Sequence, residues 1–314
     1  MNKGLKIIAN PAAGGGAGAR SIPRIEQLLS ELGLAYNLVL TQARGHAVEL
    51  ARTAAIEGWP VIVAAGGDGT ANELINGLME AREETPGPRP ALGVLGIGRG
   101  CDFAHTIGVP HDLEAACRVL AQDHRRPIDL GRVLGGLYPQ GRYFGNCVGV
   151  GFDAIATIEV SKLPRMGGFL SFFIAVLKTI FLYYRAPLTT IEVDDQTITQ
   201  PSLMVSVLNG RRLGGGFWMA PEGEPDDNLF DLCIAREMSR LQMIRMIGHF
   251  LRGTQATQEA ISTGRGARIS ITAVEGSLPA HADGEILCTD GKQLEIELLP
   301  HAIEVVSPPP GEER

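Results

Sequence analysis

The sequence predicts two domains, an α/β domain with a parallel sheet followed by an antiparallel β domain. Up to residue 126, short apolar runs alternate with segments of helical spacing, which is the pattern of a parallel sheet with crossover helices. From residue 127 onward, strand-like runs follow one another with few helices between them. The length of 314 residues fits this division, because a domain averages about 150 residues. We therefore place the domains at residues 1–126 and 127–299.

The first domain contains four apolar runs that we expect to be buried strands. They are Leu5–Ala9, Tyr36–Leu40, Val61–Ala65 and Leu92–Leu95. Between and after them, helical spacing predicts helices over Ile22–Leu32 with Pro23 in the first turn, over His46–Glu57, from about Thr70 onward, and over Leu113–Ala121.

Glycine-rich turns follow three of these strands, at Asn10–Gly18, Gly66–Thr70 and Gly96–Phe103. Ligands of an open parallel sheet bind outside the carboxyl ends of its strands, so we expect the three turns to form one crevice. Glycine lets a phosphate approach backbone N–H groups, and a helix N-terminus attracts anions. Asp68 in the second turn suits a cation or a hydroxyl held beside the phosphates. The alternative is a simple turn in which Asp68 and Thr70 only cap the helix.

Eight strands are predicted in the second domain. They are Ile128–Leu134, Arg142–Val150, Leu188–Val193, Thr197–Thr199, Leu203–Asn209, Leu229–Ala235, Ala267–Ala273 and Leu294–Leu299, with Asp194-Asp195 at a hairpin tip.

Two helices interrupt these strands. Gly168–Tyr184 is the most apolar stretch and lies at the lower length limit for crossing a bilayer. Because Lys178 lies inside it, we favour a helix packed between the domains; a transmembrane helix and a helix on a membrane surface are the alternatives. The other helix, Leu241–Leu251, has Ser239 as its cap and Gly253 as its stop.

Composition excludes several classes of protein. A net charge of -7 argues against a nucleic-acid binder, which is normally basic. The five cysteines are scattered without a CxxC motif, which argues against a zinc site or a disulfide framework and fits a reducing compartment. The first apolar run is too short for a signal peptide.

Four motifs together resemble the soluble diacylglycerol kinase catalytic family, which includes bacterial lipid kinases, sphingosine kinases and ceramide kinases. They are NPAAGGG from Asn10, GGDGTANE from Gly66, GIGRGCDFA from Gly96 and HADGE from His281. GGDGT alone is shared with NAD kinases and is similar to a phosphofructokinase turn, but the combination is more specific. The resemblance implies an NAD-kinase/phosphofructokinase-like nucleotide-binding α/β domain, a C-terminal antiparallel β-sandwich, and a last strand at residues 300–308 that rejoins the first domain.

The resemblance also implies site residues for an ATP-dependent lipid kinase that phosphorylates a lipid hydroxyl, such as that of diacylglycerol. It assigns ATP, in a crevice between the domains, to Asn10, Pro11, Ala12, Ala13, Gly14, Thr41, Gly66, Gly67, Asp68, Gly69, Thr70, Asn72, Gly98 and Arg99. The chemistry of phosphoryl transfer adds Mg²⁺ held by Asp68 beside the phosphates. The resemblance assigns a second Mg²⁺ to Asp227 with the carbonyls of Glu224 and Leu229. It assigns the general base and a magnesium contact to Asp283 and Glu285. Arg99 and Asn228 depart from the family pattern, in which a hydroxyl residue and a glycine are usual.

Three functions remain open on the sequence alone: a lipid kinase, a kinase for a soluble substrate of the NAD kinase type, and a catalytically silent nucleotide- or lipid-binding protein. We favour the lipid kinase, cytoplasmic and peripheral to the inner face of the membrane, with a lipid substrate at the membrane surface, no nucleic-acid partner and homodimerisation left open. The alternative for Asp283-Gly284 is a plain hairpin turn. For His281, beside this motif, we favour a structural role over one in tuning the base.

Overall fold

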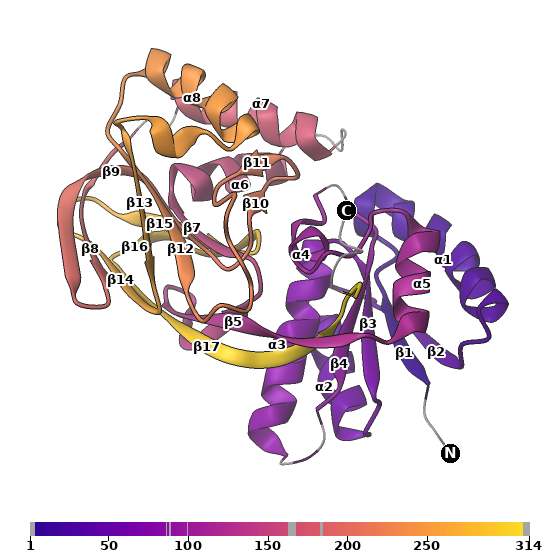
Figure 1. Ribbon diagram of the computed structural model, residues 1–314. Helices are drawn as coiled ribbons and strands as arrows, with labels where there is room; N and C mark the ends of the chain where they lie inside the picture. The colour runs from indigo at the N-terminus through magenta and orange to yellow at the C-terminus, as the bar shows by residue number, and fades with distance from the viewer. Residues whose placement is uncertain are drawn as a thin grey trace. The chain divides into compact units, whose positions relative to one another are not determined.

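The computed structural model describes residues 4–85, 87, 89–98, 100–162, 168–182 and 185–309 (Figure 1). The chain divides into two compact units, Met1–Ile128 with His301–Arg314, and Asp129–Pro300. The first unit is an α/β domain and the second contains the antiparallel strands, which confirms the predicted fold class.

The first unit is built on a parallel sheet with the strand order β4-β3-β1-β2. Its strands are β1 (Leu5–Ala9), β2 (Tyr36–Leu40), β3 (Val61–Gly66) and β4 (Ala91–Gly96). Every residue of the central strand β3 is buried, as expected for a sheet covered on both faces. The C-terminal part of β17 (Gln293–Val306) adds to this sheet, since Val305 pairs in parallel with Leu92 of β4.

Five helices are described in the first unit: α1 (Ala13–Glu31), α2 (His46–Ile56), α3 (Asp68–Glu84), α4 (Asp102–Thr106) and α5 (Leu113–Gln122). They pack in pairs, α1 with α5 and α2 with α3 (Figure 1). The prediction that the first helix begins near Ile22 was wrong, because α1 starts in the glycine-rich turn with a kink at Gly14–Gly16. Pro23 consequently lies inside α1 and not in its first turn.

The second unit is formed mainly by antiparallel strands. The strand path runs β16-β15-β7-β9-β8-β14-β17, with β12 pairing β9 and β13, and with β5 pairing β6 and β17. The bounds are β5 (Arg125–Gly135), β6 (Tyr138–Phe144), β7 (Cys147–Gly151), β8 (Leu188–Val193), β9 (Gln196–Leu208), β12 (Phe230–Arg236), β13 (Ile261–Gly266), β14 (Arg268–Ala273), β15 (Leu278–Ala282) and β16 (Glu285–Gly291), with the short pair β10 (Arg212–Leu213) and β11 (Phe217–Trp218). In the core of this unit the rings of Phe144 and Phe230 stack, with their centroids 5.5 Å apart.

Several strand predictions in this unit were wrong in detail. The run Arg142–Val150 is not one strand, because the chain turns at Gly145 and Asn146 between β6 and β7. Conversely, Thr197–Thr199 and Leu203–Asn209 belong mainly to one strand, β9, which continues through Pro201. The strands β13, β15 and β16 were not predicted.

Three helices are described in the second unit: α6 (Phe152–Lys162), α7 (Gly168–Leu182) and α8 (Arg240–Arg252). The caps of α8 are confirmed, since Ser239 and Gln242 form a capping box and Gly253 ends the helix with φ 69°. The helix α6 was not predicted, and α7 packs against α6 and α8. Among the described residues, no helix combines the length and the apolar character needed to cross a bilayer.

Candidate active site

The loop after β1 is organised by the side chain of Asn10. Its Nδ2 donates to Thr70 Oγ1 at 3.1 Å, and its Oδ1 accepts the Ala12 N–H at 3.0 Å. The glycines Gly14–Gly16 have φ values between 56° and 90°, a region that side chains disfavour. No side chain covers the backbone at these three glycines, so an anion can approach it closely.

The turn after β3 leads into α3, with Gly67 as the N-cap and Asp68 in the first helical turn. Because the N-cap is a glycine, it contributes no side chain over the first helical N–H groups. A Cβ added at Gly67 would meet Gly98 Cα at 3.7 Å and Ile97 O at 3.8 Å, which is ordinary contact. Packing within this domain thus does not require glycine at position 67, whereas a phosphate against the helix N-terminus would.

The turn after β4 is bonded directly to the turn after β3. The Ile97 N–H donates to Gly66 O at 2.7 Å, and Asp68 Oδ1 accepts the Phe103 N–H at 2.9 Å at the start of α4. The three glycine turns therefore lie together at the carboxyl ends of β1, β3 and β4, as the sequence analysis expected. This is one continuous, glycine-lined region of the first unit.

In the second unit, the DGE motif forms the hairpin turn between β15 and β16. Asp283 and Gly284 have φ values of 47° and 85°, as tight hairpins require. The Asp283 carboxylate accepts the N–H groups of Gly145, Asn146 and Cys147 at 2.8–3.0 Å. Both of its oxygens therefore fix the link between β6 and β7. A plain hairpin turn, the alternative considered for Asp283-Gly284, would not include these contacts.

Comparison with known proteins agrees with this geometry. Residues 4–133 match the family model of the diacylglycerol kinase catalytic domain, and residues 146–307 match that of the YegS C-terminal NAD kinase beta sandwich-like domain. The chain is 31% identical to a diacylglycerol kinase of Bacillus subtilis over 90% of each chain. This chain belongs to the diacylglycerol kinase family of lipid kinases.

Further relatives agree with the assignment. The kinase is 32% identical to a protein of Chromohalobacter salexigens named "Probable lipid kinase YegS-like", over 78% of this chain and 76% of the relative. Its fold is that of a solved diacylglycerol kinase structure from Bacillus anthracis, with a TM-score of 0.74, 23% identity, and coverage of 98% of this chain and 97% of that chain. The resemblance stated from the motifs is thereby confirmed.

Most of the residues assigned to ATP lie in the three turns of the kinase, but three of the polar side chains among them are buried. Thr41, Thr70 and Asn72 are 8%, 4% and 1% exposed. Thr70 accepts the hydrogen bond from Asn10, and the Asn72 carbonyl accepts one from Asn76 Nδ2 at 2.8 Å inside α3. The Thr70 side chain thus connects the turn after β3 to the loop after β1. Arg99 lies outside the described residues.

Magnesium that arrives with a nucleotide needs only one or two protein carboxylates beside phosphate oxygens and water. Asp68 fits this role by its place at the N-terminus of α3. Among the described residues, no group of three or more His, Cys, Asp or Glu side chains is arranged to hold a metal ion by itself. One carboxylate such as Asp68 is enough to contact a magnesium ion that a nucleotide also holds.

The second magnesium site, at Asp227, fits less well. Asp227 Oδ1 accepts the Leu229 N–H at 3.1 Å, while Oδ2 pairs with Arg265. Arg265 also pairs with Asp231 at 3.2 Å, a group whose pKa burial raises. Two of the carboxylates in this region therefore share one guanidinium, which already supplies a positive charge beside Asp227.

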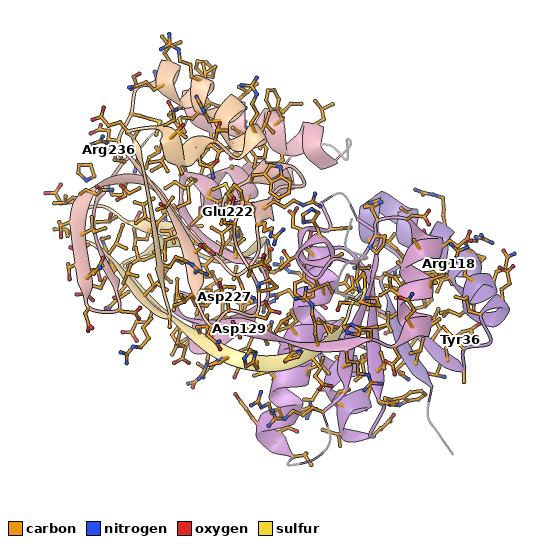
Figure 2. The ribbon with its side chains drawn as sticks, viewed as in Figure 1. Tyr36, Arg118, Asp129, Glu222, Asp227 and Arg236 are labelled. Atoms are coloured by element: carbon orange, nitrogen blue, oxygen red, sulfur yellow. The ribbon has the colours of Figure 1, made fainter. Side chains whose placement is uncertain are left out.

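The turn that carries this proposed second site keeps the conformation expected for it. Asn228 has φ 65°, so asparagine adopts the left-handed conformation in place of the usual glycine. Its N–H donates to Asp129 Oδ2 at 2.7 Å, and Asp129 lies beside Asp227 (Figure 2). The Glu224 carboxylate pairs with Arg211. Protein groups therefore contribute to holding this turn.

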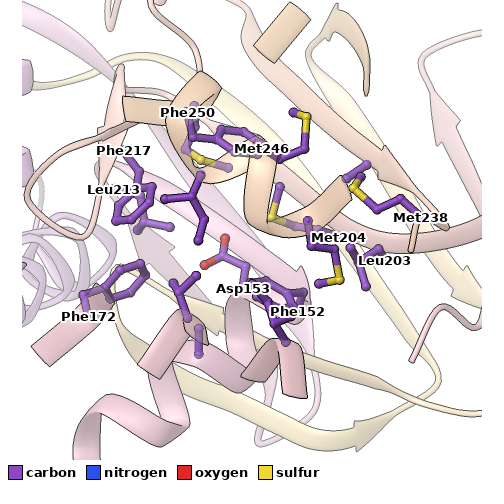
Figure 3. A pocket seen from close by; sticks show the side chains of 17 residues that line it. Phe152, Asp153, Phe172, Leu203, Met204, Leu213, Phe217, Met238, Met246 and Phe250 are labelled. Atoms are coloured by element: carbon purple, nitrogen blue, oxygen red, sulfur yellow. The ribbon is translucent and has the colours of Figure 1, made fainter. Parts of the chain in front are cut away.

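An apolar pocket lies in the second unit beside α6, α7 and α8 (Figure 3). It is partly open to solvent. The lining consists of apolar side chains with one exception, Asp153, and comprises Phe152, Asp153, Ala156, Phe172, Val176, Ile180, Leu203, Met204, Leu213, Phe217, Met219, Ala235, Met238, Met243, Met246, Ile247 and Phe250. Three residues of the apolar stretch, Phe172, Val176 and Ile180, line this pocket together with Met243 and Met246 of α8.

Proposed function

We propose that this lipid kinase transfers the γ-phosphoryl group of ATP to a hydroxyl of a lipid such as diacylglycerol. The observation that carries the proposal is the pocket of the second unit, which is apolar except for Asp153. A pocket with apolar walls and few polar groups suits a hydrocarbon ligand. The names of the relatives support the same substrate class.

We propose that ATP binds at the three glycine turns. Phosphoryl transfer depends mainly on positioning and on stabilising charge, and backbone N–H groups at glycine turns and a helix N-terminus supply both. Magnesium, when bound with ATP at Asp68, would neutralise charge on the phosphate oxygens. The residue that most directly supports this placement is Gly67, because the atoms around it leave room for a side chain and so do not require a glycine there.

We propose the DGE motif as the source of the general base. A positioned carboxylate accepts the proton of the attacking hydroxyl and is typically worth about 10²–10⁴ in rate. Asp283 is held by three backbone N–H groups, and Glu285 is half-buried on the next strand. The Asp283 carboxylate is therefore held in a fixed position.

We also propose peripheral contact with a membrane through the outer faces of α7 and α8. Among the described residues of these helices, five large apolar side chains are exposed, namely Leu170, Phe181, Leu182, Leu241 and Ile244. Arg240 and Arg245 are exposed on α8, and neither helix contains an acidic residue. Apolar and basic residues together suit the surface of an anionic bilayer. The inner faces of the same helices line the pocket, so a lipid would leave the bilayer beside it.

The proposal is tested by incubating the purified protein with γ-³²P-labelled ATP and Mg²⁺. One arm contains mixed micelles with dioleoylglycerol, a second contains micelles without it, and a third contains NAD. We expect label in a lipid-soluble product only in the first arm. Labelled NAD without labelled lipid would contradict the proposal.

A further inference from the structure

The last residue of the GGDGTANE motif, Glu73, is a half-buried residue of α3 whose carboxylate reaches the neighbouring helix α2. Its Oε1 accepts the N–H of Gly45 at 2.8 Å, and its Oε2 accepts the N–H of Ala47 at 3.1 Å. Both donors lie at the N-terminus of α2, whose N-cap Gly45 has no side chain that could accept them. A carboxylate there satisfies N–H groups that a helix cannot satisfy by itself, and the helix dipole favours it. Glu73 therefore caps α2 from outside.

The same carboxylate fixes the loop at residues 41–45, which follows β2 and is exposed from residue 42 onward. At the start of the loop, the Thr41 N–H donates to Ala9 O at 2.9 Å. At its end, Gly45 has a φ of 83°, and its N–H is held by Glu73. A Cβ added at Gly45 would meet no atom of the described residues within 4 Å, so glycine is needed there for the backbone conformation and not for space.

Helix α3 joins this loop to the glycine turns. Thr70 Oγ1 accepts Asn10 Nδ2 of the loop after β1 at 3.1 Å, and Glu73, three residues further along α3, holds the loop after β2. One helical turn later, a Cβ at Gly77 would lie 2.2 Å from Val48 O, so α3 and α2 approach each other closely. The helix that begins at the second glycine turn therefore sets the positions of two neighbouring loops.

The loop at residues 41–45 continues the edge of the sheet at which we place the phosphates. Strand β1 pairs in parallel with β3 and with β2, and Ala9 lies opposite both Ala65 and Leu40. Neighbouring strands lie about 4.8 Å apart, so the end of β2 is about 10 Å from the end of β3. The Gly45 N–H is already used by Glu73 and is not offered to a phosphate. A nucleotide with its phosphates at the glycine turns can reach this loop with its nucleoside.

We propose that Glu73 is a positioning residue for ATP, which caps α2 and thereby holds the loop at residues 41–45 as a wall for the nucleoside. This inference rests on the proposed function, because it takes the phosphates to lie at the glycine turns. Glu73 acts through the loop and not by touching the nucleotide, since both of its oxygens accept backbone N–H groups. Its contribution to ATP affinity therefore comes through the nucleoside.

The first test is steady-state kinetics of the full chain with ATP, Mg²⁺ and dioleoylglycerol in mixed micelles. Glu73→Ala removes both acceptors and should raise the KM for ATP about tenfold, while kcat and the KM for the lipid stay within about threefold of the parent values. Glu73→Gln keeps one oxygen acceptor, so its KM for ATP should lie between those of the parent and Glu73→Ala. An unchanged KM for ATP in Glu73→Ala, with or without a fall in kcat, would overturn the positioning role.

The matched control for the loss of a helix cap is Asp112→Ala. Asp112 is the N-cap of α5 in the same unit, and its Oδ1 accepts the Ala115 N–H at 2.9 Å. Both variants remove a carboxylate from a helix N-terminus, so both should lower the melting temperature by a few degrees. Only Glu73→Ala should raise the KM for ATP. Equal changes of this KM at equal melting temperatures would show that lost stability, and not the loop, explains the result.

A binding experiment separates the nucleoside from the phosphates. Calorimetry without lipid compares ATP with inorganic tripolyphosphate, which has the phosphates but no nucleoside, both with Mg²⁺. Glu73→Ala should weaken ATP binding about tenfold and leave tripolyphosphate binding within about threefold, whereas Gly67→Ala should weaken both. Equal weakening of both ligands by Glu73→Ala would overturn the assignment of the loop to the nucleoside.

The parent protein separates this inference from the proposed function. If the parent binds ATP and phosphorylates dioleoylglycerol, and Glu73→Ala binds ATP equally tightly, this inference alone is wrong. If the parent neither binds ATP nor phosphorylates the lipid, the proposed function is wrong and this inference falls with it.

Discussion

Lys178, in the most apolar helix of the chain, donates a hydrogen bond to Glu159 of α6, whose side chain is only 1% exposed. Lys162 donates to the other carboxylate oxygen at 2.6 Å. The charge that argued against a transmembrane helix thus has a partner inside the second unit. The hydrogen bonds from Lys162 and Lys178 lower the pKa of Glu159, and burial opposes them only in part.

This pair predicts a loss of stability in acid. The folded-state pKa of Glu159 lies below its usual value. The contribution of Glu159 to the free energy of unfolding is therefore complete above the unfolded-state pKa of about 4.3, and it is lost as the pH falls through the folded-state pKa. Glu159→Gln should lower the unfolding free energy at pH 7 by about 1–3 kcal/mol and weaken the pH dependence below pH 4.3. Urea unfolding at several pH values measures both.

The control for this experiment is Glu259→Gln. Glu259 pairs with Arg236, but its side chain is 96% exposed, so the change should cost less than about 1 kcal/mol. Equal costs for the two variants would contradict the importance of burial at Glu159.

Gly67→Ala should weaken ATP binding without disturbing the fold. The added Cβ would make only ordinary contacts, the nearest at 3.7 Å. The melting temperature should therefore stay within about 2 °C of the parent, whereas calorimetric ATP affinity should fall about tenfold.

Gly98→Ala is the structural contrast to Gly67→Ala. Its Cβ would lie 2.9 Å from Gly67 Cα, so this variant should melt earlier. Parental ATP affinity in Gly67→Ala would place the phosphates elsewhere.

The elements that the sequence predicted best are those with strong local signals. The bounds of β1 and β2 were predicted correctly, because apolar runs end at turn residues there. The caps at Ser239 and Gly253 were recognisable because each acts within its own helix. The start of α1 was missed because glycines with positive φ precede the regular helix, and their conformation depends on what surrounds them.

The pocket carboxylate was not predictable in the same way. Asp153 contacts Ser206 and His281, which strand pairing brings to either side of Gly149. Those contacts join residues that are far apart in the sequence, so no local sequence pattern predicts them. The same holds for Arg265, which neutralises the Asp227 carboxylate assigned to magnesium.

Asp283→Asn should destabilise the protein as well as reduce its activity. An amide cannot accept from Gly145, Asn146 and Cys147 with both of its atoms, so one N–H would face the amide nitrogen. The expected cost is about 1–3 kcal/mol. Glu285→Gln should leave the melting temperature nearly unchanged. Activity of both variants should be compared well below the lower melting point.

Two outcomes of that comparison are informative. If Glu285→Gln alone lowers kcat by about 10²–10⁴ at parental stability, Glu285 is the base. A parental melting temperature for Asp283→Asn would contradict the anchoring role of Asp283.

Arg265→Gln should make stability respond to magnesium. In the parent, Arg265 pairs with Asp227 and Asp231, so millimolar Mg²⁺ should change the melting temperature little. Without the guanidinium, two neighbouring carboxylates can bind a dication, which stabilises the folded state by mass action.

Arg236→Gln is the control for Arg265→Gln, since Arg236 pairs with one exposed carboxylate. A parent already strongly stabilised by Mg²⁺, with Arg265→Gln no different, would support a metal site at Asp227 as the resemblance implied.

Replacing the apolar residues on the outer face of α8 should release the protein from membranes. Leu241 and Ile244 are 59% and 39% exposed, and burying a side chain of this kind fully in an apolar phase is worth about 1.5–3 kcal/mol. The double variant Leu241→Glu with Ile244→Glu removes that gain and adds repulsion from anionic headgroups. Co-sedimentation with phosphatidylglycerol vesicles should therefore fall at least about tenfold.

Leu137→Glu is the matched control, because Leu137 is 71% exposed at the β5–β6 turn, away from both helices. Equal sedimentation of the double variant and the parent would place the membrane contact elsewhere. Peripheral binding would be contradicted if washing with salt and alkali left the parent protein on the membrane and only detergent released it.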